Sequence, residues 1–343
     1  MESILETLIE EKRGEEASKL DAISIVSNLF DDLMDREKDV LVRRFGLNGD
    51  KKETLEKIGK IHQLTRERVR QIESSSLKKI KKLDSLEENL AVLKDVVETL
   101  LDQHGGLMRR DYLLDILTVA VLEIIDEKKE IDEKERNAYR NHFDFLLSRV
   151  LNNDFELLSE SEKFNSSLKL KEASTEHLEE LADDLIAKVE TFKKTLSTEE
   201  LLQLLKELDS YNKYQEELKK EKEVDLFKIL KSQTFPDKAE IINSNKILYS
   251  LMQSIKNLER NKFGYWGIAS WQEVKPKTIN DKIFLVLKNA GEPLHFTEIA
   301  RRINEVGFDK KVANPATVHN ELILDNRYIL TGRGMYGLKE WNN

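Results

Sequence analysis

The stretch TLEKIGKIHQLTRERVRQIE, residues 54–73, decides the fold of the N-terminal part of this chain. Thr54 and Thr65 are preferred helix N-caps, and residues 62–64 between the two segments fit a short turn. Apolar residues recur at helical spacing after each cap; they are Leu55, Ile58, Ile61, Val69, Ile72, Leu77 and Ile80. Two helices joined by a tight turn predict a helix-turn-helix whose second helix follows Thr65.

Charge is distributed unevenly along the chain. The net charge is −9, yet residues 36–82 contain 15 Lys and Arg against 7 Asp and Glu, a local balance of +8. A basic segment within an acidic chain is typical of a surface that binds a polyanion. A solvated helix face of mixed charge is the alternative interpretation of the same residues.

The predicted second helix carries polar residues where a DNA-reading helix needs them. On its first two turns they lie away from the apolar stripe, where arginine can pair with guanine and glutamate can accept from cytosine. Lysines further along the helix would meet phosphates. The predicted DNA-binding residues are Thr65, Arg66, Glu67, Arg68, Arg70, Gln71, Lys78 and Lys79, with Lys81 and Lys82 as further phosphate contacts.

The segment before the turn supplies a third helix. REKDVLVRRFGL, residues 36–47, has apolar residues at helical spacing and ends at a glycine. Together with TLEKIGKIHQLTRERVRQIESSSLKKIKKL, residues 54–83, it resembles region 4 of the bacterial sigma-70 family. The resemblance implies a helix-turn-helix that reads the minus-35 promoter element and docks on the flap of RNA polymerase. It places Arg66, Glu67, Arg70 and Gln71 at base- and backbone-contacting positions.

The resemblance is confined to residues 31–84. No other stretch resembles the sigma domain that binds core polymerase and melts the minus-10 element, so a self-sufficient sigma factor is not implied.

The C-terminal residues repeat the helix-turn-helix theme with a hairpin added. Apolar spacing predicts helices within 278–308 and a third helix opened by Asn314 and Pro315. YILTGRGMYGL, residues 328–338, then predicts a β-hairpin. Residues 277–341 resemble the HARE-type winged helix, also found at the start of the RNA polymerase delta subunit and attached to some restriction enzymes. Arg333 at the wing tip is a candidate DNA contact, with a solvated turn arginine as the alternative.

Short internal matches indicate that this plan recurs. WGIASW at 266–271 parallels YGLKEW at 336–341, and residues 95–170 offer a third helix–helix–hairpin pattern. The sequence therefore predicts a mainly α, multidomain protein in which a sigma region 4-like helix-turn-helix precedes winged-helix modules with small β-hairpins. The predicted segments are an acidic helical segment at 1–30, the helix-turn-helix at 31–84, a winged helix at 85–172, a helical region with a degenerate winged helix at 173–275, and the HARE-type winged helix at 276–343.

Several classes of function lack the residues they need. The chain has no cysteine, no phosphate-binding glycine loop and no basic, apolar leader, and no segment approaches membrane-spanning length. A nuclease-like pattern, Asp154 upstream of Glu160–Lys163, is a weak alternative because a chain with 65 acidic residues produces such spacings by chance. We therefore expect a cytoplasmic protein that is not an enzyme, with no cofactor, metal or membrane partner.

The predicted function is a sequence-specific DNA-binding transcription factor associated with bacterial-type RNA polymerase. Its expected partners are double-stranded DNA and the polymerase core. One alternative is a delta-like accessory subunit of the polymerase with little specific DNA binding. A more distant alternative is the DNA-recognition part of a restriction system.

Overall fold

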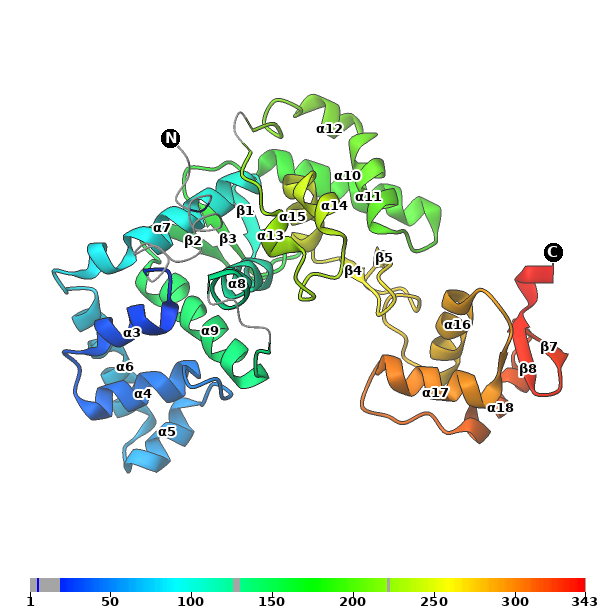
Figure 1. Cartoon of the computed structure of the whole chain (residues 1–343), viewed down its shortest axis with the longest axis horizontal. Helices are drawn as coiled ribbons and strands as arrows, with labels where there is room; N and C mark the ends of the chain where they lie inside the picture. Colours follow the sequence, from blue (N-terminus) through cyan, green and yellow to red (C-terminus); the bar gives the residue numbers. More distant parts are fainter. Residues whose placement is uncertain (1–4, 6–18, 126–129, 221–222, 343) are drawn as a thin grey trace. The chain divides into compact units, whose positions relative to one another are not determined.

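The computed structural model describes residues 5, 19–125, 130–220 and 223–342 (Figure 1). Within them the chain is mainly helical, with small antiparallel sheets, which confirms the predicted fold class. It divides into two compact units that are described separately. Unit 1 comprises 1–181 and 209–254, and unit 2 comprises 182–208 and 255–343. Most of the predicted acidic segment 1–30 lies outside the described residues.

Helices α3 to α6 of unit 1 contain the predicted helix-turn-helix. Asp21, Thr54 and Thr65 cap helices by accepting backbone N–H groups two or three residues later. Gly46 ends the second helix in the left-handed conformation. The helices are α3 Ala22–Phe30, α4 Asp35–Phe45, α5 Leu55–His62 and α6 Arg66–Ile80.

The turn between α5 and α6 depends on a close approach of backbone. Gln63 adopts φ 56°, a left-handed conformation that is uncommon outside glycine. The chain then folds back so closely that a Cβ at Gly59 would lie 2.7 Å from the carbonyl oxygen of Leu64. A glycine at position 59 therefore allows the turn to close against α5.

The helix-turn-helix has a small core of its own, formed by Val40, Ile58, Val69 and Ile72. Ile61 belongs to the apolar pattern of α5 but does not face this core, because it is 46% exposed. At about 100° per residue, position 61 lies roughly 120° around the helix from Leu55, whereas position 62 lies within about 20° of it. His62 therefore takes the inward place, and its Nε2 lies 2.7 Å from an oxygen of Asp39 on α4.

The next part of unit 1 has the order helix, strand, helix, helix, hairpin. The sheet order is β1-β3-β2, so the first strand pairs with the last. The second and third helices each end in a short π-helical segment. The elements are α7 Leu86–Gln103, β1 Leu107–Arg109, α8 Arg110–Val119, η1 Ala120–Ile125, α9 Glu133–Phe145, η2 Leu146–Val150, β2 Phe155–Leu158 and β3 Ser167–Leu170.

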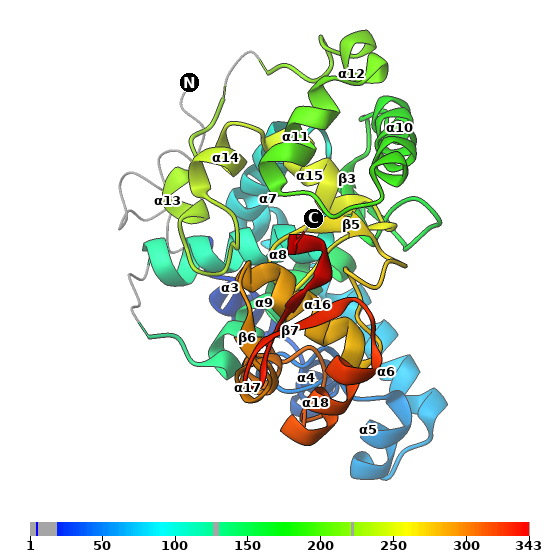
Figure 2. The ribbon, with the colours of Figure 1, turned by 90° about the vertical axis from the view of Figure 1, so that its right-hand side faces the viewer.

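Among the described residues of 209–254, four further helices belong to unit 1. The last of them packs along β1, where the Ser250 hydroxyl donates to the Leu107 carbonyl at 2.8 Å. In both views these helices lie at the opposite end of unit 1 from α5 and α6 (Figures 1 and 2). They are α12 Asp209–Lys213, α13 Phe227–Leu230, α14 Ala239–Asn243 and α15 Lys246–Ser254, and α10 Glu176–Phe192 runs from unit 1 into unit 2.

Unit 2 contains two hairpins, each followed by a tryptophan. Its C-terminal part has three helices with a sheet ordered β6-β8-β7, the same order as in unit 1. The elements are α11 Thr198–Lys206, β4 Leu258–Arg260, β5 Trp266–Ile268, α16 Ile279–Ala290, β6 Leu294–His295, α17 Phe296–Val306, α18 Pro315–Leu324, β7 Tyr328–Gly332, β8 Met335–Leu338 and η3 Lys339–Asn342.

The sequence match between 266–271 and 336–341 has a counterpart in side-chain packing. A Cβ at Gly267 would lie 2.9 Å from the Trp271 ring, and one at Gly337 would lie 3.2 Å from the Trp341 ring. Each glycine thus leaves room for the tryptophan four residues later. The range 173–275 is nevertheless shared between the units, because residues 209–254 belong to unit 1.

Candidate nucleic-acid interface

The start of α6 presents polar side chains to solvent. The Thr65 hydroxyl accepts the backbone N–H of Arg68 at 3.2 Å and fixes the first turn. Val69 and Ile72 are buried on one side of the helix, so the intervening positions point outward. Six residues predicted to bind DNA are exposed here: Thr65, Arg66, Glu67, Arg68, Arg70 and Gln71.

Two side-chain pairs organise this surface. Arg70 donates through Nε and Nη2 to both oxygens of Glu67, at 2.9 and 2.7 Å. This hydrogen bond holds the pKa of Glu67 below its usual value. Arg68 donates to the Gln71 amide oxygen at 3.1 Å. In the described parts of the chain Arg66 has no hydrogen bond or ion pair, so its guanidinium is available to a ligand.

Some of the lysines at the end of α6 and directly after it are engaged in contacts within unit 1. Lys79 contacts both carboxylate oxygens of the buried Glu37, at 2.8 and 2.9 Å, and lowers the pKa of that carboxyl. Lys79 thereby links α6 to the start of α4, and its charge is already balanced within unit 1. Lys81 donates to Asn152. Lys78 and Lys82 are exposed and have no ion pair among the described residues.

The back of the helix-turn-helix is covered by the rest of unit 1. The Phe145 ring on α9 lies 4.9 Å from that of Phe45 and 5.8 Å from that of Phe30. Leu41 and Ile80 are buried in the same large core, outside the small core of the helix-turn-helix. The module is therefore built into unit 1 rather than attached by a linker.

Polar contacts hold the loop between α4 and α5 on α9. Asn141 donates to the Gly46 carbonyl at 2.8 Å, and Lys52 pairs with the buried Asp144 at 2.6 Å. Arg110 binds the same Asp144 carboxylate. The sequence analysis missed these positioning residues because each pair joins positions many residues apart, with no local pattern to reveal it.

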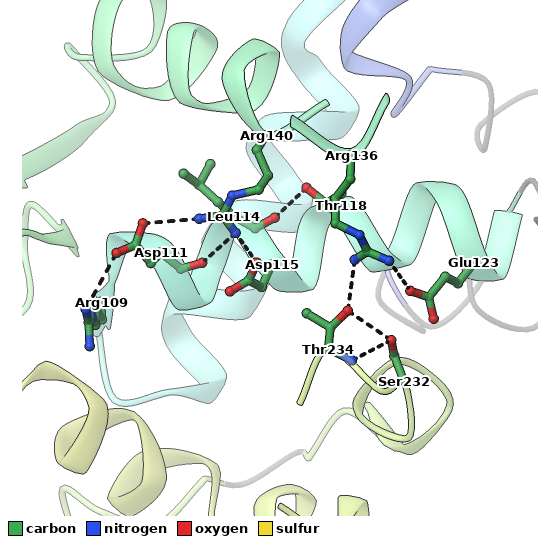
Figure 3. A network of polar contacts seen from close by, with 10 residues as sticks. All are labelled: Arg109, Asp111, Leu114, Asp115, Thr118, Glu123, Arg136, Arg140, Ser232 and Thr234. Carbon is green, nitrogen blue, oxygen red and sulfur yellow. Dashed lines mark hydrogen bonds and ion pairs between the residues drawn. The ribbon is translucent and has the colours of Figure 1, made fainter. Parts of the chain in front are cut away.

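The remaining polar face of α9 is held by α8 and its neighbours (Figure 3). Arg140 binds Asp111 at 3.1 Å and also Asp115. Arg136 binds Glu123 at 3.0 Å and the Thr234 hydroxyl at 2.8 Å. In a helix-turn-helix the second helix enters the major groove. In the α8–α9 pair, the Arg136 and Arg140 side chains of this helix are engaged within the protein.

The predicted contact in unit 2 lies at its wing tip. Arg333 occupies the turn between β7 and β8, is exposed, and makes no hydrogen bond or ion pair within the described ranges. The exposed face of α18, the second helix of the α17–α18 pair, carries no lysine or arginine.

The residues of the nuclease-like pattern have other contacts. Asp154 pairs with Lys94 at 2.6 Å, and Lys163 pairs with Glu179 at 3.6 Å. Among the described residues no three His, Asp or Glu side chains gather in a way that suits a metal ion. In the same part of the chain, no helix combines the length and apolar character needed to span a bilayer.

Comparison with known proteins bears on the N-terminal module. The family model "Sigma-70, region 4" matches residues 29–82. The RNA polymerase sigma factors SigA of Microcystis aeruginosa and of Synechocystis sp. are each 48% identical to this chain over 56 residues. Residues 29–82 are similar to sigma-70 region 4. That resemblance is confirmed.

The similarity covers only part of each protein. It spans 16% of this chain, and 14% and 13% of the two sigma factors. No solved structure matches the chain. The HARE-type resemblance of the C-terminal residues stays a prediction.

Proposed function

We propose that unit 1 binds double-stranded DNA through α6 and that the protein is a sequence-specific transcription factor associated with bacterial-type RNA polymerase. The observation that carries this proposal is the exposed start of α6 within a segment similar to sigma-70 region 4. The local charge of +8, from 15 basic and 7 acidic residues over 36–82, steers this face toward DNA.

Each exposed side chain has a distinct task in this proposal. Arg66, which is unpaired among the described residues, pairs with the O6 and N7 atoms of a guanine. Glu67 accepts from cytosine N4 and is held in position by Arg70. Thr65, Arg68 and Gln71 contact the sugar–phosphate backbone beside the start of the helix.

We assign phosphate binding to Lys78 and Lys82. Lys78 and Lys82 lie beyond the reading residues and make no ion pair in the described structure. Lys79 contributes indirectly, by fixing α6 against α4. In unit 2, Arg333 is the proposed phosphate contact, with a solvated turn arginine as the alternative.

Association with RNA polymerase rests on the relatives. Both relatives are named RNA polymerase sigma factors, and the sigma-70 region 4 model matches residues 29–82, which contain the helix-turn-helix. We extend polymerase association to this chain as part of the proposal.

The test is selection of bound sequences from random DNA duplexes with the full-length protein, in the absence of polymerase. We expect a defined motif that contains a guanine, and loss of preference at that position in Arg66→Ala. Met34→Ala, a change at an exposed side chain outside α6, serves as the control. A motif-free outcome together with co-purification of core polymerase would favour the delta-like accessory role instead.

A further inference from the structure

One arginine near the end of α4 contacts both helices of the helix-turn-helix. Nη1 of Arg44 donates to the carbonyl oxygen of Glu53 at 3.1 Å, and Glu53 directly precedes Thr54, the residue that caps α5. Nε of Arg44 lies 3.3 Å from Oε2 of Glu73 on α6. A single side chain of α4 therefore joins the start of α5 to the middle of α6.

A second ion pair joins α4 to α6 with the charges reversed. Lys79 near the end of α6 contacts Glu37 near the start of α4. At 1.5 Å per residue, positions 37 and 44 are about 10 Å apart along α4, and positions 73 and 79 are about 9 Å apart along α6. The two pairs therefore match in spacing between antiparallel helices. A shift of α6 along α4 would bring like charges together, so the pairs favour one register.

The carboxylates of both pairs are largely withdrawn from solvent. The side chains of Glu37 and Glu73 are 8% and 13% exposed, whereas their cationic partners are 48% and 32% exposed. Fully exposed ion pairs contribute little to stability, but a carboxylate held away from water needs its partner. Loss of the Arg44 cation would therefore favour a rotation of α6 that returns the Glu73 carboxylate to water.

The direction of Glu73 determines the direction of the proposed reading residue Arg66. Arg66 precedes Glu73 by seven residues, which at about 100° per residue places the two within about 20° of each other around α6. A rotation of α6 by about 20° moves a side-chain end that lies about 6 Å from the helix axis by about 2 Å. A bidentate contact with guanine requires closer placement than that.

We propose that Arg44 is a positioning residue for base reading by α6. Through Glu73 it sets the rotation of α6 about its axis, and through the Glu53 carbonyl it fixes the start of α5. Arg44 acts through these residues rather than on a base. This inference rests on the proposed function, because it concerns how α6 is presented to DNA.

Direct binding of a phosphate by Arg44 is the competing role, and the two roles predict different results for Glu73. If Arg44 only bound phosphate, Glu73→Gln would release the arginine and leave sequence discrimination intact. If Arg44 positions α6, Glu73→Gln lowers discrimination. Glu73 also has a favourable interaction with Arg70. Arg44→Ala leaves that interaction in place, so both variants are needed.

The first experiment measures the affinity of the full-length protein for its selected duplex and for the same duplex with the guanine pair exchanged. We expect Arg44→Ala and Glu73→Gln each to lower the ratio of the two affinities about tenfold, because a bidentate contact with guanine supplies discrimination of that order. The double variant should lose no more than either single variant, because all three remove the same contact. The salt dependence of non-specific binding should stay unchanged in Arg44→Ala.

Two control variants repeat these changes at exposed side chains. Arg36 on α4 and Glu88 on α7 have no ion pair or hydrogen bond within the described ranges, so Arg36→Ala and Glu88→Gln should keep the wild-type ratio. Thermal melting ensures that each variant is folded at the temperature of the binding measurement. The proposal is overturned if Glu73→Gln keeps the wild-type ratio or if the losses add in the double variant. It is also overturned if Arg44→Ala lowers the slope of log K against log salt by about one with discrimination intact.

A second experiment measures the orientation of α6 without DNA. The chain has no cysteine, so Arg36→Cys and Gln71→Cys place one spin label on each of α4 and α6, at exposed positions. We expect a narrow distribution of distances between the labels, and a broader one when Glu73→Gln is added. An unchanged distribution overturns the proposal whether or not the wild type selects a DNA motif. Failure of this inference is therefore distinguishable from failure of the proposed function.

Discussion

Replacing Phe145 by alanine should destabilise unit 1 without touching the proposed DNA surface. The side chain is fully buried on α9, and its ring packs against Phe30 and Phe45 at 5.8 and 4.9 Å. Truncation of a buried phenylalanine costs about 3–5 kcal/mol through lost burial and the cavity that remains. The two aromatic contacts, each worth about 0.5–1.5 kcal/mol, place the expected loss in the upper part of that range.

The assay is urea unfolding of the full-length protein followed by far-UV circular dichroism. Phe192→Ala is the matched control, because this phenylalanine is 43% exposed and its removal should cost less than about 1.5 kcal/mol. At low denaturant, where Phe145→Ala is still folded, its sequence preference for DNA should equal that of the wild type. A loss below about 1 kcal/mol for Phe145→Ala would refute the conclusion that α9 supports the helix-turn-helix.

Three other predictions concern α6 and the residues directly after it. Arg66→Ala should cost about 1–3 kcal/mol of discrimination at one base pair with unchanged thermal melting, as measured by competition binding. Lys78→Ala and Lys82→Ala should each lower the slope of log K against log salt by about one unit for every sequence tested; an unchanged slope would show that they face solvent in the complex. Lys79 lowers the pKa of Glu37 below its ordinary 4.5, so this pair stabilises the fold above that pH and its contribution is lost as pH falls through the lowered value. Acid unfolding of Lys79→Ala should therefore show a weaker pH dependence than that of the wild type, and an identical profile would count against the pair.

Local signals were sufficient to predict the helix-turn-helix. Thr54 and Thr65 cap their helices as the sequence indicated, and Gly46 ends α4. These features depend on residues within a few positions of one another, so a sequence pattern records them. The exposure of Ile61 also has a local cause: a three-residue spacing from Leu55 through Ile58 moves around the helix, so that His62 rather than Ile61 lies on the side of Leu55.

Other features depend on residues far apart in the chain. Lys79 was predicted to contact phosphate. Its partner Glu37 lies 42 positions earlier, so no local sequence pattern indicated that the two side chains form a pair. Phe45 packs against Phe145 of α9, and nothing in the sequence indicated that contact.

The position of Phe145 has a consequence for how the chain can vary. In a protein whose modules are joined by linkers, the helix-turn-helix and its neighbour would accept substitutions independently. Here Phe45 and Phe145 share one contact, so a smaller side chain at one position is best tolerated with a larger one at the other. Substitutions in α9 are therefore constrained by the sigma-like module, although α9 belongs to a different part of the chain.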